Sequence, residues 1–336
     1  MAMNSLQRTT NLLEGKPVDH LPAMPIIMLW GAARYGHSYA DYTRDHRVLC
    51  ECQLRLCEEF GLDILQLISD PVRETADCGA EMIYYDDNPP RAANLVLADK
   101  SALGTMQMPD PYRGRMGDRV AGARRLKHVA GDEYPIMGWV EGPVAEAVDL
   151  RGMTDLMMDL VTDIGFCRDL MDWVVELEIA FALAQIDAGC HMIGIGDAAA
   201  SLINADIYRD EVLPREKRIV AAIRDAGAIA RLHICGNTTH ILAEMAETGC
   251  EIIDLDHTAD MEIARERMGP GPVLLGNFDP VSFVLDGTPD TVYAACAWCH
   301  ERAGKRYIVG PGCEVPPGTP AENIHTMVRY AREATA

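Results

Sequence analysis

The sequence predicts an α/β protein folded as a (β/α)8 (TIM) barrel, and three observations support this prediction. Eight short apolar runs recur along the 336 residues, and helical patterns lie between them. The runs are nearly continuous in hydrophobicity, which is typical of parallel strands buried on both faces. Polar or metal-binding side chains follow nearly every run, where barrel enzymes carry their active sites. An open doubly wound sheet is the alternative architecture.

The predicted strands are rich in β-branched and aliphatic residues. They span residues 22–29, 63–69, 135–140, 192–196, 228–234, 251–255, 272–275 and 307–309. Helical patterns cover residues 157–188, 205–226, 237–248 and 289–303. Strands that alternate with helices through right-handed crossovers close most simply into a barrel.

One stretch, residues 71–134, interrupts this alternation. It contains the turn signal Asp-Asp-Asn-Pro-Pro at residues 86–90, which predicts a hairpin, and then a polar segment rich in Gly and Arg. We therefore expect one barrel domain over residues 1–336, with 71–134 as an insertion after the second strand that serves as a lid.

The net charge of the chain limits the kinds of partner that it can bind. The chain has 30 Lys and Arg against 51 Asp and Glu, a net charge of −21. A field of this sign repels phosphate groups, so we expect neither nucleic acid nor a membrane as a partner. The first residues lack an apolar signal core, and no run of about 18 apolar residues occurs. These features predict a cytoplasmic protein.

The eleven cysteines do not indicate a disulfide framework, because their number is odd and no export signal is seen. The run from Cys296 to His300 matches the C-x-x-C-H pattern of haem attachment. Haem attachment of that kind requires export, and residues 289–303 read as an amphipathic helix. We therefore interpret these cysteines as buried structural residues.

A second spacing indicates a metal centre. His233 and Cys235 are two residues apart, so in a strand their side chains point to the same face. Gly236 lets the backbone turn directly after them. Cys313 ends the last strand, and the tops of strands converge across a barrel mouth. Zinc accepts this set of ligands with one position left for substrate, whereas a buried structural His–Cys pair is the alternative.

Other strand ends carry candidate site residues. The candidate catalytic residues are Asp70, Glu141 and Asp256. The candidate substrate-binding residues are Trp30, Arg34, Tyr35, Asp197 and Asn277. For each of these residues, capping of the next helix or packing at the rim is the alternative interpretation.

Several segments resemble the uroporphyrinogen decarboxylase superfamily. They are residues 9–22, 63–70, 78–81, 140–143 and 276–280, and the resemblance spans essentially the whole chain. It implies the barrel fold. Within the superfamily, His233 and Cys235 together with Cys313 resemble the H-x-C…C zinc motif of methylcobamide:coenzyme M methyltransferases and related corrinoid methyltransferases.

The chain departs from the decarboxylase pattern at the residues that hold substrate. The decarboxylase motif M-R-Q-A-G-R-Y is here Met-Leu-Trp-Gly-Ala-Ala-Arg-Tyr, and Arg34 fits only with one inserted residue. The late G-H-G segment has Pro311 in place of histidine. Asp70 matches the catalytic aspartate, but one acid cannot bind eight carboxylates. Porphyrinogen decarboxylation is therefore the minority hypothesis.

The resemblance implies a zinc-dependent methyltransferase that moves a methyl group between a corrinoid and a thiol or methylated small molecule. The alternative is a methyl donor:corrinoid protein methyltransferase of an O-demethylase system, in which Zn2+ acts as a Lewis acid. The corrinoid is expected on a separate partner protein, because the chain lacks a D-x-H-x-x-G motif. A third hypothesis, a zinc-binding module without catalysis, is disfavoured by the polar strand ends.

Overall fold

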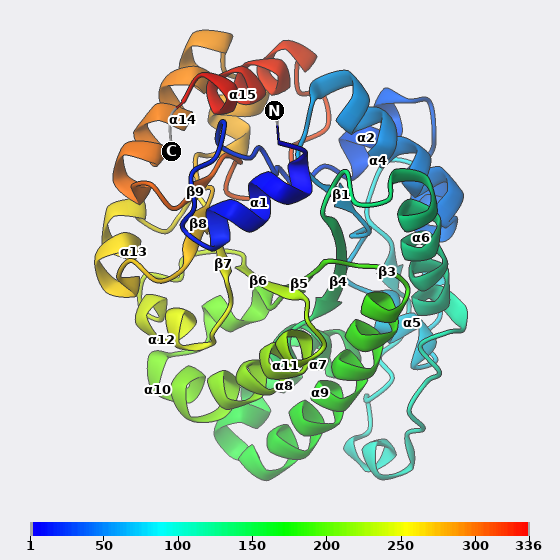
Figure 1. The fold of residues 1–336 in the computed structure, drawn as a ribbon. Helices are drawn as coiled ribbons and strands as arrows, with labels where there is room; N and C mark the ends of the chain where they lie inside the picture. The colour runs from blue at the N-terminus through cyan, green and yellow to red at the C-terminus, as the bar shows by residue number, and fades with distance from the viewer. Residues whose placement is uncertain (1–2, 335–336) are drawn as a thin grey trace.

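The fold is an α/β barrel, seen along its axis in Figure 1. The computed structural model describes residues 3–334. Within these residues, seven parallel strands form one sheet in chain order. They are β1 (Leu65–Gln66), β4 (Ile136–Glu141), β5 (Met192–Gly196), β6 (Ile229–Ile234), β7 (Ile252–Leu255), β8 (Val273–Leu275) and β9 (Tyr307–Ile308). Each strand pairs with the next through a crossover, which confirms the predicted fold class.

The first predicted strand, 22–29, is extended chain rather than a regular strand. Ala23 forms an isolated parallel bridge with Val309, and its carbonyl oxygen accepts a hydrogen bond from the Asp63 N–H at 3.0 Å. This segment therefore lies between β9 and the chain before β1, where an eighth strand closes the ring. Pro22 and Pro25 lack an N–H, so no regular ladder forms there. The end of the predicted range lies in helix α2 (Leu29–Arg34).

A ring of helices surrounds the sheet (Figure 1). The longer ones are α4 (His46–Phe60), α6 (Gly114–Ala130), α7 (Pro143–Arg151), α8 (Met153–Thr162), α9 (Ile164–Asp187), α11 (Leu213–Asp225), α13 (Met261–Met268), α14 (Pro289–Ala303) and α15 (Ala321–Glu333). The predicted helix 157–188 is divided at Asp163, which caps α9. The predicted helix 237–248 shortens to α12 (Leu242–Glu247). Cys296 and Cys299 are buried in α14, which covers the predicted range 289–303.

The remaining elements are short. They are α3 (Tyr39–Arg44), α5 (Arg73–Asp77), η1 (Lys100–Thr105), η2 (Ala198–Leu202), α10 (Ala205–Ile207), η3 (Tyr208–Val212) and η4 (Pro280–Leu285). Together α10, η3 and α11 cover residues 205–225 of the predicted helix 205–226.

The region between β1 and β4 contains a hairpin in addition to the crossover helix that a barrel needs there. An antiparallel hairpin of β2 (Met82–Ile83) and β3 (Arg91–Ala92) encloses the predicted turn. After it, α6 packs against α4, α5 and β4, as the crossover helix of a barrel does. The predicted range 71–134 thus includes a helix of the barrel ring. Its role as a lid stays a prediction.

The barrel interior is closed at its amino-terminal end. Helix α1 (Ser5–Leu13) lies across this end (Figure 1), and Leu12 packs with interior side chains such as Met24 and Ile308. Arg8 donates to Asp63 at 2.6 Å and anchors the helix. Open space is therefore left at the carboxyl ends of the strands. No helix in residues 3–334 is both long and apolar enough to cross a membrane.

Candidate metal centre

The three predicted metal ligands lie together at the carboxyl end of the barrel. His233 is near the end of β6, Cys235 follows it, and Cys313 comes from the loop after β9. His233 Nε2 is 3.1 Å from Cys235 Sγ, and the two Sγ atoms are 4.0 Å apart. All three ligand atoms lie within 4.8 Å of one another. Tetrahedral zinc with ordinary bond lengths needs ligand separations of about 3.5–3.8 Å, so the set fits zinc with small adjustments.

The orientation of the His233 ring is set from the neighbouring strand. His233 pairs in register with Asp254 of β7, and its Nδ1 is 3.2 Å from the Asp254 carbonyl oxygen and 3.3 Å from Oδ2. Arg231 donates to the same carboxylate at 2.5 Å. A histidine whose Nδ1 donates to such a partner presents Nε2 to a metal. The Nε2 atom here faces Cys235.

The triad favours an ionised sulfur. A hydrogen bond with Cys235 and the nearby His233 lower the pKa of Cys313 to about 4, against the effect of burial. The hydrogen bond with Cys313 and burial raise the pKa of Cys235. Burial lowers the pKa of His233, but Cys235 and Asp254 raise it more. The thiolate of Cys313 is therefore stabilised next to a protonated His233, and a bound cation would have to displace the protons of His233 and Cys235.

Two glycines allow the ligand loops to approach. Gly236 has a φ of +89°, and a Cβ there would lie 2.9 Å from Ser201 Oγ. A Cβ on Gly312 would collide with the backbone nitrogen of His257. Asp256 accepts hydrogen bonds from the N–H groups of Gly236 and Thr258 and so fixes the turn after Cys235.

A cavity of about 220 Å³ opens in front of the triad. Its apolar wall includes Ile26, Met28, Ile68 and Trp139. Its acidic wall consists of Asp70, Glu141 and Glu314. The indole of Trp139 occupies the space that a side chain would need at Gly194 and Gly196 of β5. The two glycines of β5 therefore make room for Trp139 of β4.

Arginines outside the cavity lining donate hydrogen bonds to two of the three cavity acids. Both oxygens of Asp70 accept from Arg115, at 2.8 and 2.6 Å. Burial opposes ionisation of Asp70, but Arg115 outweighs it and lowers the pKa. Glu141 accepts from Arg73 at 2.8 Å, yet burial raises the pKa of Glu141 well above its usual value. Burial raises the pKa of Glu314 to about 7.

Three of the predicted substrate-binding residues lie outside this cavity. Trp30 is buried, and its Nε1 donates to the Thr319 carbonyl oxygen at 2.8 Å. Arg34 and Tyr35 both contact Glu59 near the surface. These contacts are of the kind that rim packing makes, and a substrate-binding role for the three residues stays a prediction.

Asp197 and Asn277 also have structural partners. Asp197 accepts from the N–H groups of Val144 and Ala145 at the start of α7. The Asn277 amide donates to the Asp256 carbonyl oxygen at 3.1 Å. Asn277 also lines a separate, largely apolar cavity of about 580 Å³ between η4 and α14. A substrate-binding role for these two residues stays a prediction.

Sequence reasoning missed several residues of the site. Arg231 and Asp254 carried a usable signal, because a charged residue inside an apolar strand needs a buried partner. The sequence indicated only weakly that Trp139 and Arg73 belong to the site. Arg115 carried no signal, because it belongs to the polar segment of α6 and its partner Asp70 is 45 residues earlier.

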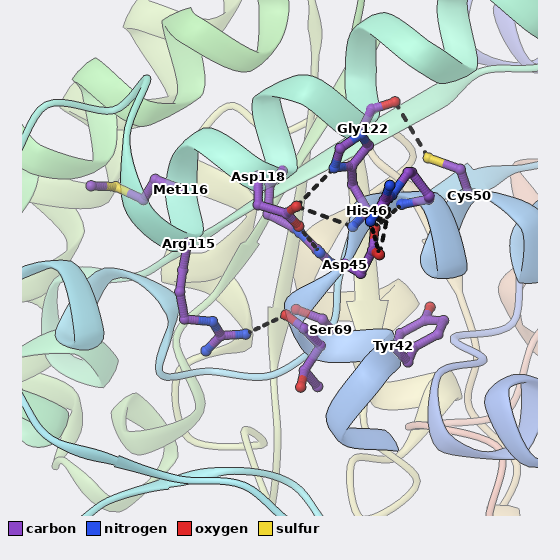
Figure 2. A network of polar contacts seen from close by, with 12 residues as sticks. Tyr42, Asp45, His46, Cys50, Ser69, Arg115, Met116, Asp118 and Gly122 are labelled. Carbon is purple, nitrogen blue, oxygen red and sulfur yellow. Dashed lines mark hydrogen bonds and ion pairs between the residues drawn. The ribbon is translucent and has the colours of Figure 1, made fainter. Parts of the chain in front are cut away.

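A second group of potential ligands lies on the outside of the barrel, where α4 meets α6 (Figure 2). It consists of Asp45, His46 and Asp118. Asp45 caps α4 and pairs with Arg47 at 2.7 Å, and Asp118 pairs with Arg119. Because arginines already neutralise both carboxylates, this group lacks the excess of negative charge that attracts a cation.

Comparison with known proteins places the chain in a family. The uroporphyrinogen decarboxylase (URO-D) family profile matches residues 4–334. The methylcobamide:CoM methyltransferase MtbA of Methanosarcina mazei is 34% identical, with 97% of each chain covered. A uroporphyrinogen decarboxylase of Nocardia farcinica is 29% identical over 82% of this chain and 78% of its own.

A solved methyltransferase from Methanosarcina mazei has the same fold. It superposes with a TM-score of 0.90 at 24% identity, covering 98% of this chain and 99% of the other. The chain is thus a member of the uroporphyrinogen decarboxylase family, with methylcobamide:CoM methyltransferases among its relatives.

Proposed function

We propose that this protein is a zinc-dependent methyltransferase that moves a methyl group between a corrinoid and a small thiol. The observation that carries the proposal is the His233, Cys235 and Cys313 triad, which lies at the open end of the barrel and faces a small cavity. The full-length similarity to a methylcobamide:CoM methyltransferase supports the same reaction class.

The residues of the chain would each have a defined task. His233, Cys235 and Cys313 would hold Zn2+, and the two thiolates balance its charge. When bound, zinc would promote ionisation of an incoming thiol and leave its sulfur nucleophilic. Asp254 holds the His233 ring, and Asp256 holds the turn after Cys235. The apolar wall with Trp139 would keep water away from the reacting sulfur.

The transfer needs an acceptor for a proton. A methylated corrinoid would supply the methyl group and keep the electron pair of the broken bond, and the thiol that takes up the methyl group must lose its proton. We assign this proton to the carboxylate of Glu141, which lines the cavity and pairs with Arg73; burial raises the pKa of Glu141, which makes its ionised form a stronger base than a carboxylate in water. Asp70, fixed by Arg115, would shape the opposite wall.

The corrinoid would be presented by a partner protein. A cavity of about 220 Å³ holds a small thiol but is far too small to enclose a corrinoid ring. The ring must therefore approach the barrel mouth from outside and expose only its methyl group to the cavity. A separate corrinoid protein meets this requirement.

A second candidate is the reverse transfer from a methylated small molecule to the corrinoid. The apolar wall of Ile26, Met28 and Trp139 favours it, because a methylated group would pack there. Decarboxylation of a porphyrinogen is disfavoured, since the cavity is small and its lining, within residues 3–334, has no arginine or lysine to bind substrate carboxylates.

The test is metal analysis followed by a methylcobalamin assay. We expect about one zinc per chain and thiol-dependent loss of methylcobalamin, followed by absorbance. Zinc without thiol turnover, but with methylation of Co(I) by an aryl methyl ether, would support the second candidate. A protein without zinc, or one that converts uroporphyrinogen, would refute both.

A further inference from the structure

We propose that a cavity at the amino-terminal end of the barrel binds a small organic anion of the phosphate ester class. The cavity lies at the opposite end of the barrel from the candidate metal centre. Its lining comes from the end of α1, from α13 and the segment after it, and from the segment between α14 and β9. In Figure 1 the end of α1 lies beside the starts of β8 and β9. This proposal does not depend on the proposed function.

The charge of the lining is the first observation. The cavity has a volume of about 610 Å³, and four cationic side chains line it: Lys16, Arg265, Lys305 and Arg306. Among the residues that the structure describes, no aspartate or glutamate belongs to this lining. The chain has 51 acidic against 30 basic residues, so the lining has the opposite charge to the chain as a whole. Clustered lysines and arginines of this kind recognise anions.

Arg265 is held by backbone carbonyl groups rather than by a carboxylate. Its Nε donates to the Ala303 carbonyl oxygen at 2.7 Å, and its Nη1 donates to the Gly269 carbonyl oxygen at 2.7 Å. Its Nη2 donates to the Arg306 carbonyl oxygen at 3.1 Å. These oxygens fix the guanidinium group but carry only partial charges. Burial, and then the nearby charge of Arg306, lower the pKa of Arg265 to about 10. A bound anion would supply the missing counter-charge.

Arg306 has N–H groups left for a ligand. Its Nη2 donates to the Leu13 carbonyl oxygen at 3.2 Å, and its Nη1 is 3.5 Å from the Leu12 carbonyl oxygen. Its Nε is buried and has no hydrogen-bond acceptor among the described residues. The Nη1 atom lies next to Gly15 of the cavity lining, where an added Cβ would be 3.7 Å away. A phosphate oxygen in the cavity would accept a charge-assisted hydrogen bond from this guanidinium group.

The rest of the lining favours an organic ligand over an inorganic ion. Leu12, Pro17, Pro270 and Ala303 form an apolar wall beside the cations. A volume of about 610 Å³ is in the range of cavities that hold small organic molecules. A phosphate ester would place its phosphate on the cations and pack its organic part against the apolar wall.

The acidity of the whole chain limits the size of this ligand. The net charge of −21 repels anions at long range. Salt screens that field over about 8 Å, whereas the cations of the cavity contact the ligand directly. A nucleic acid would extend from the cavity over the acidic surface. The cavity therefore fits a small phosphate ester and not a polymer.

Calorimetry on the full chain with three probes tests the proposal. Adenosine diphosphate (ADP) carries phosphates and an organic part, pyrophosphate carries only the phosphates, and adenosine carries no charge. We expect ADP to bind about tenfold more tightly than pyrophosphate, because its organic part covers the apolar wall. Adenosine should show no measurable binding. The affinity for ADP should fall as salt is added.

Variants place the binding in this cavity. Lys305→Gln and Arg306→Gln should each weaken ADP binding about tenfold, because each removes a charged donor. Lys305 is exposed, so its replacement leaves the fold intact. The matched control is Lys217→Gln, which removes the same charge from α11, where Lys217 pairs with Glu247 at 3.2 Å. This control should bind ADP as the unmodified protein does.

Each outcome bears on the proposal. Weaker ADP binding in both cavity variants, with none of this loss in Lys217→Gln, supports it. Absence of ADP binding, an unchanged affinity in Lys305→Gln and Arg306→Gln, or an equal loss in the control would overturn it. Equal affinities for pyrophosphate and ADP would overturn the assignment of an organic ligand.

Discussion

At the scale of single residues, the two cysteines of the triad differ although their sulfurs are neighbours. Cys313 ionises easily, because the Cys235 hydrogen bond and the His233 imidazole stabilise its thiolate. Cys235 keeps its proton in the absence of metal, and the pKa of this thiol is raised. A bound zinc ion would displace that proton, so metal binding is expected to weaken as pH falls.

The first prediction concerns these ligands. Cys235→Ser and Cys313→Ser should each lose zinc and activity, because the serine hydroxyl does not ionise near neutral pH. Metal content per chain after gel filtration measures this loss. Cys299→Ser is the control: Cys299 is buried in α14 and contacts the Asn277 N–H at 3.5 Å, away from the triad. Retention of a full zinc equivalent in Cys313→Ser would rule out the three-ligand centre.

At the scale of elements, Cys235 and Cys313 lie in the loops that follow β6 and β9, and the backbone of each loop turns sharply next to its cysteine. The turn after β6 depends on Gly236, whose positive φ is unfavourable for other residues. The loop after β9 depends on Gly312, which packs on the backbone of His257. Asp256, at the end of β7, ties the first turn to the neighbouring strand.

The second prediction separates backbone strain from metal binding. Gly236→Ala adds a methyl group 2.9 Å from Ser201 Oγ at a φ of +89°, so the turn must shift and carry Cys235 with it. Zinc affinity should fall, and stability should fall by about 1–2 kcal/mol. Gly227→Ala is the matched control, because Gly227 has a φ of +82° with no atom within 4 Å of the added Cβ. It should lose similar stability and bind zinc normally. Equal zinc affinity in the two variants would contradict the role given to the turn.

At the scale of the whole molecule, the metal would join the ends of β6 and β9 across the barrel mouth. Ligands from these two strands come from positions 78 residues apart in the chain. A cation that binds only the folded form stabilises it by mass action. The barrel is thus expected to depend on the metal for part of its stability.

The third prediction follows from that linkage. Removal of zinc with a chelator should lower the melting temperature by several degrees, since a site loaded at about 1,000 times its Kd contributes about 4 kcal/mol. Differential scanning calorimetry measures the shift. The melting temperature of Cys235→Ser should not respond to the chelator, and a matching decrease in that variant would exclude the triad as the cause.

The fourth prediction concerns a buried acid pair that joins α11 to the end of β5. Burial raises the pKa of Glu216 from 4.5 to about 7, and burial together with Glu216 raises that of Asp197. Because the folded state holds the Glu216 proton more tightly, the stability that this proton contributes is complete below pH 4.5. It is lost as the pH rises through about 7.

Glu216→Gln removes this ionisation while its amide oxygen still accepts from the Tyr208 hydroxyl. The decrease in unfolding free energy between pH 4.5 and 7.5 should therefore be smaller by about 1–3 kcal/mol in the variant. Urea denaturation in chelator measures it, so that protons linked to zinc do not contribute. The exposed Glu262→Gln variant should show the same change in unfolding free energy with pH as the unmodified protein. The same pH dependence in all three proteins would refute the prediction.

The sequence by itself determined the positions of most strands and the candidate ligands. Apolar runs mark buried parallel strands, and the spacing of His233 and Cys235 places both side chains on one face. Pro22 and Pro25 changed the first strand into extended chain, because a residue without an N–H cannot complete a ladder. The spacing of apolar side chains along a strand or helix follows from the local backbone geometry, so it can be read from neighbouring residues in the sequence.

Only the tertiary structure decided which side chains meet at the cavity. Asp70 faces the cavity while Arg115 holds it from α6, and Asp254 supports His233 across a strand pair. Asp197 and Asn277 also follow strands, yet their partners are backbone groups of neighbouring loops and helices. Such pairings depend on how elements distant in the chain pack together, and no local pattern encodes them. The set of side chains that lines the cavity is therefore a property of the folded barrel.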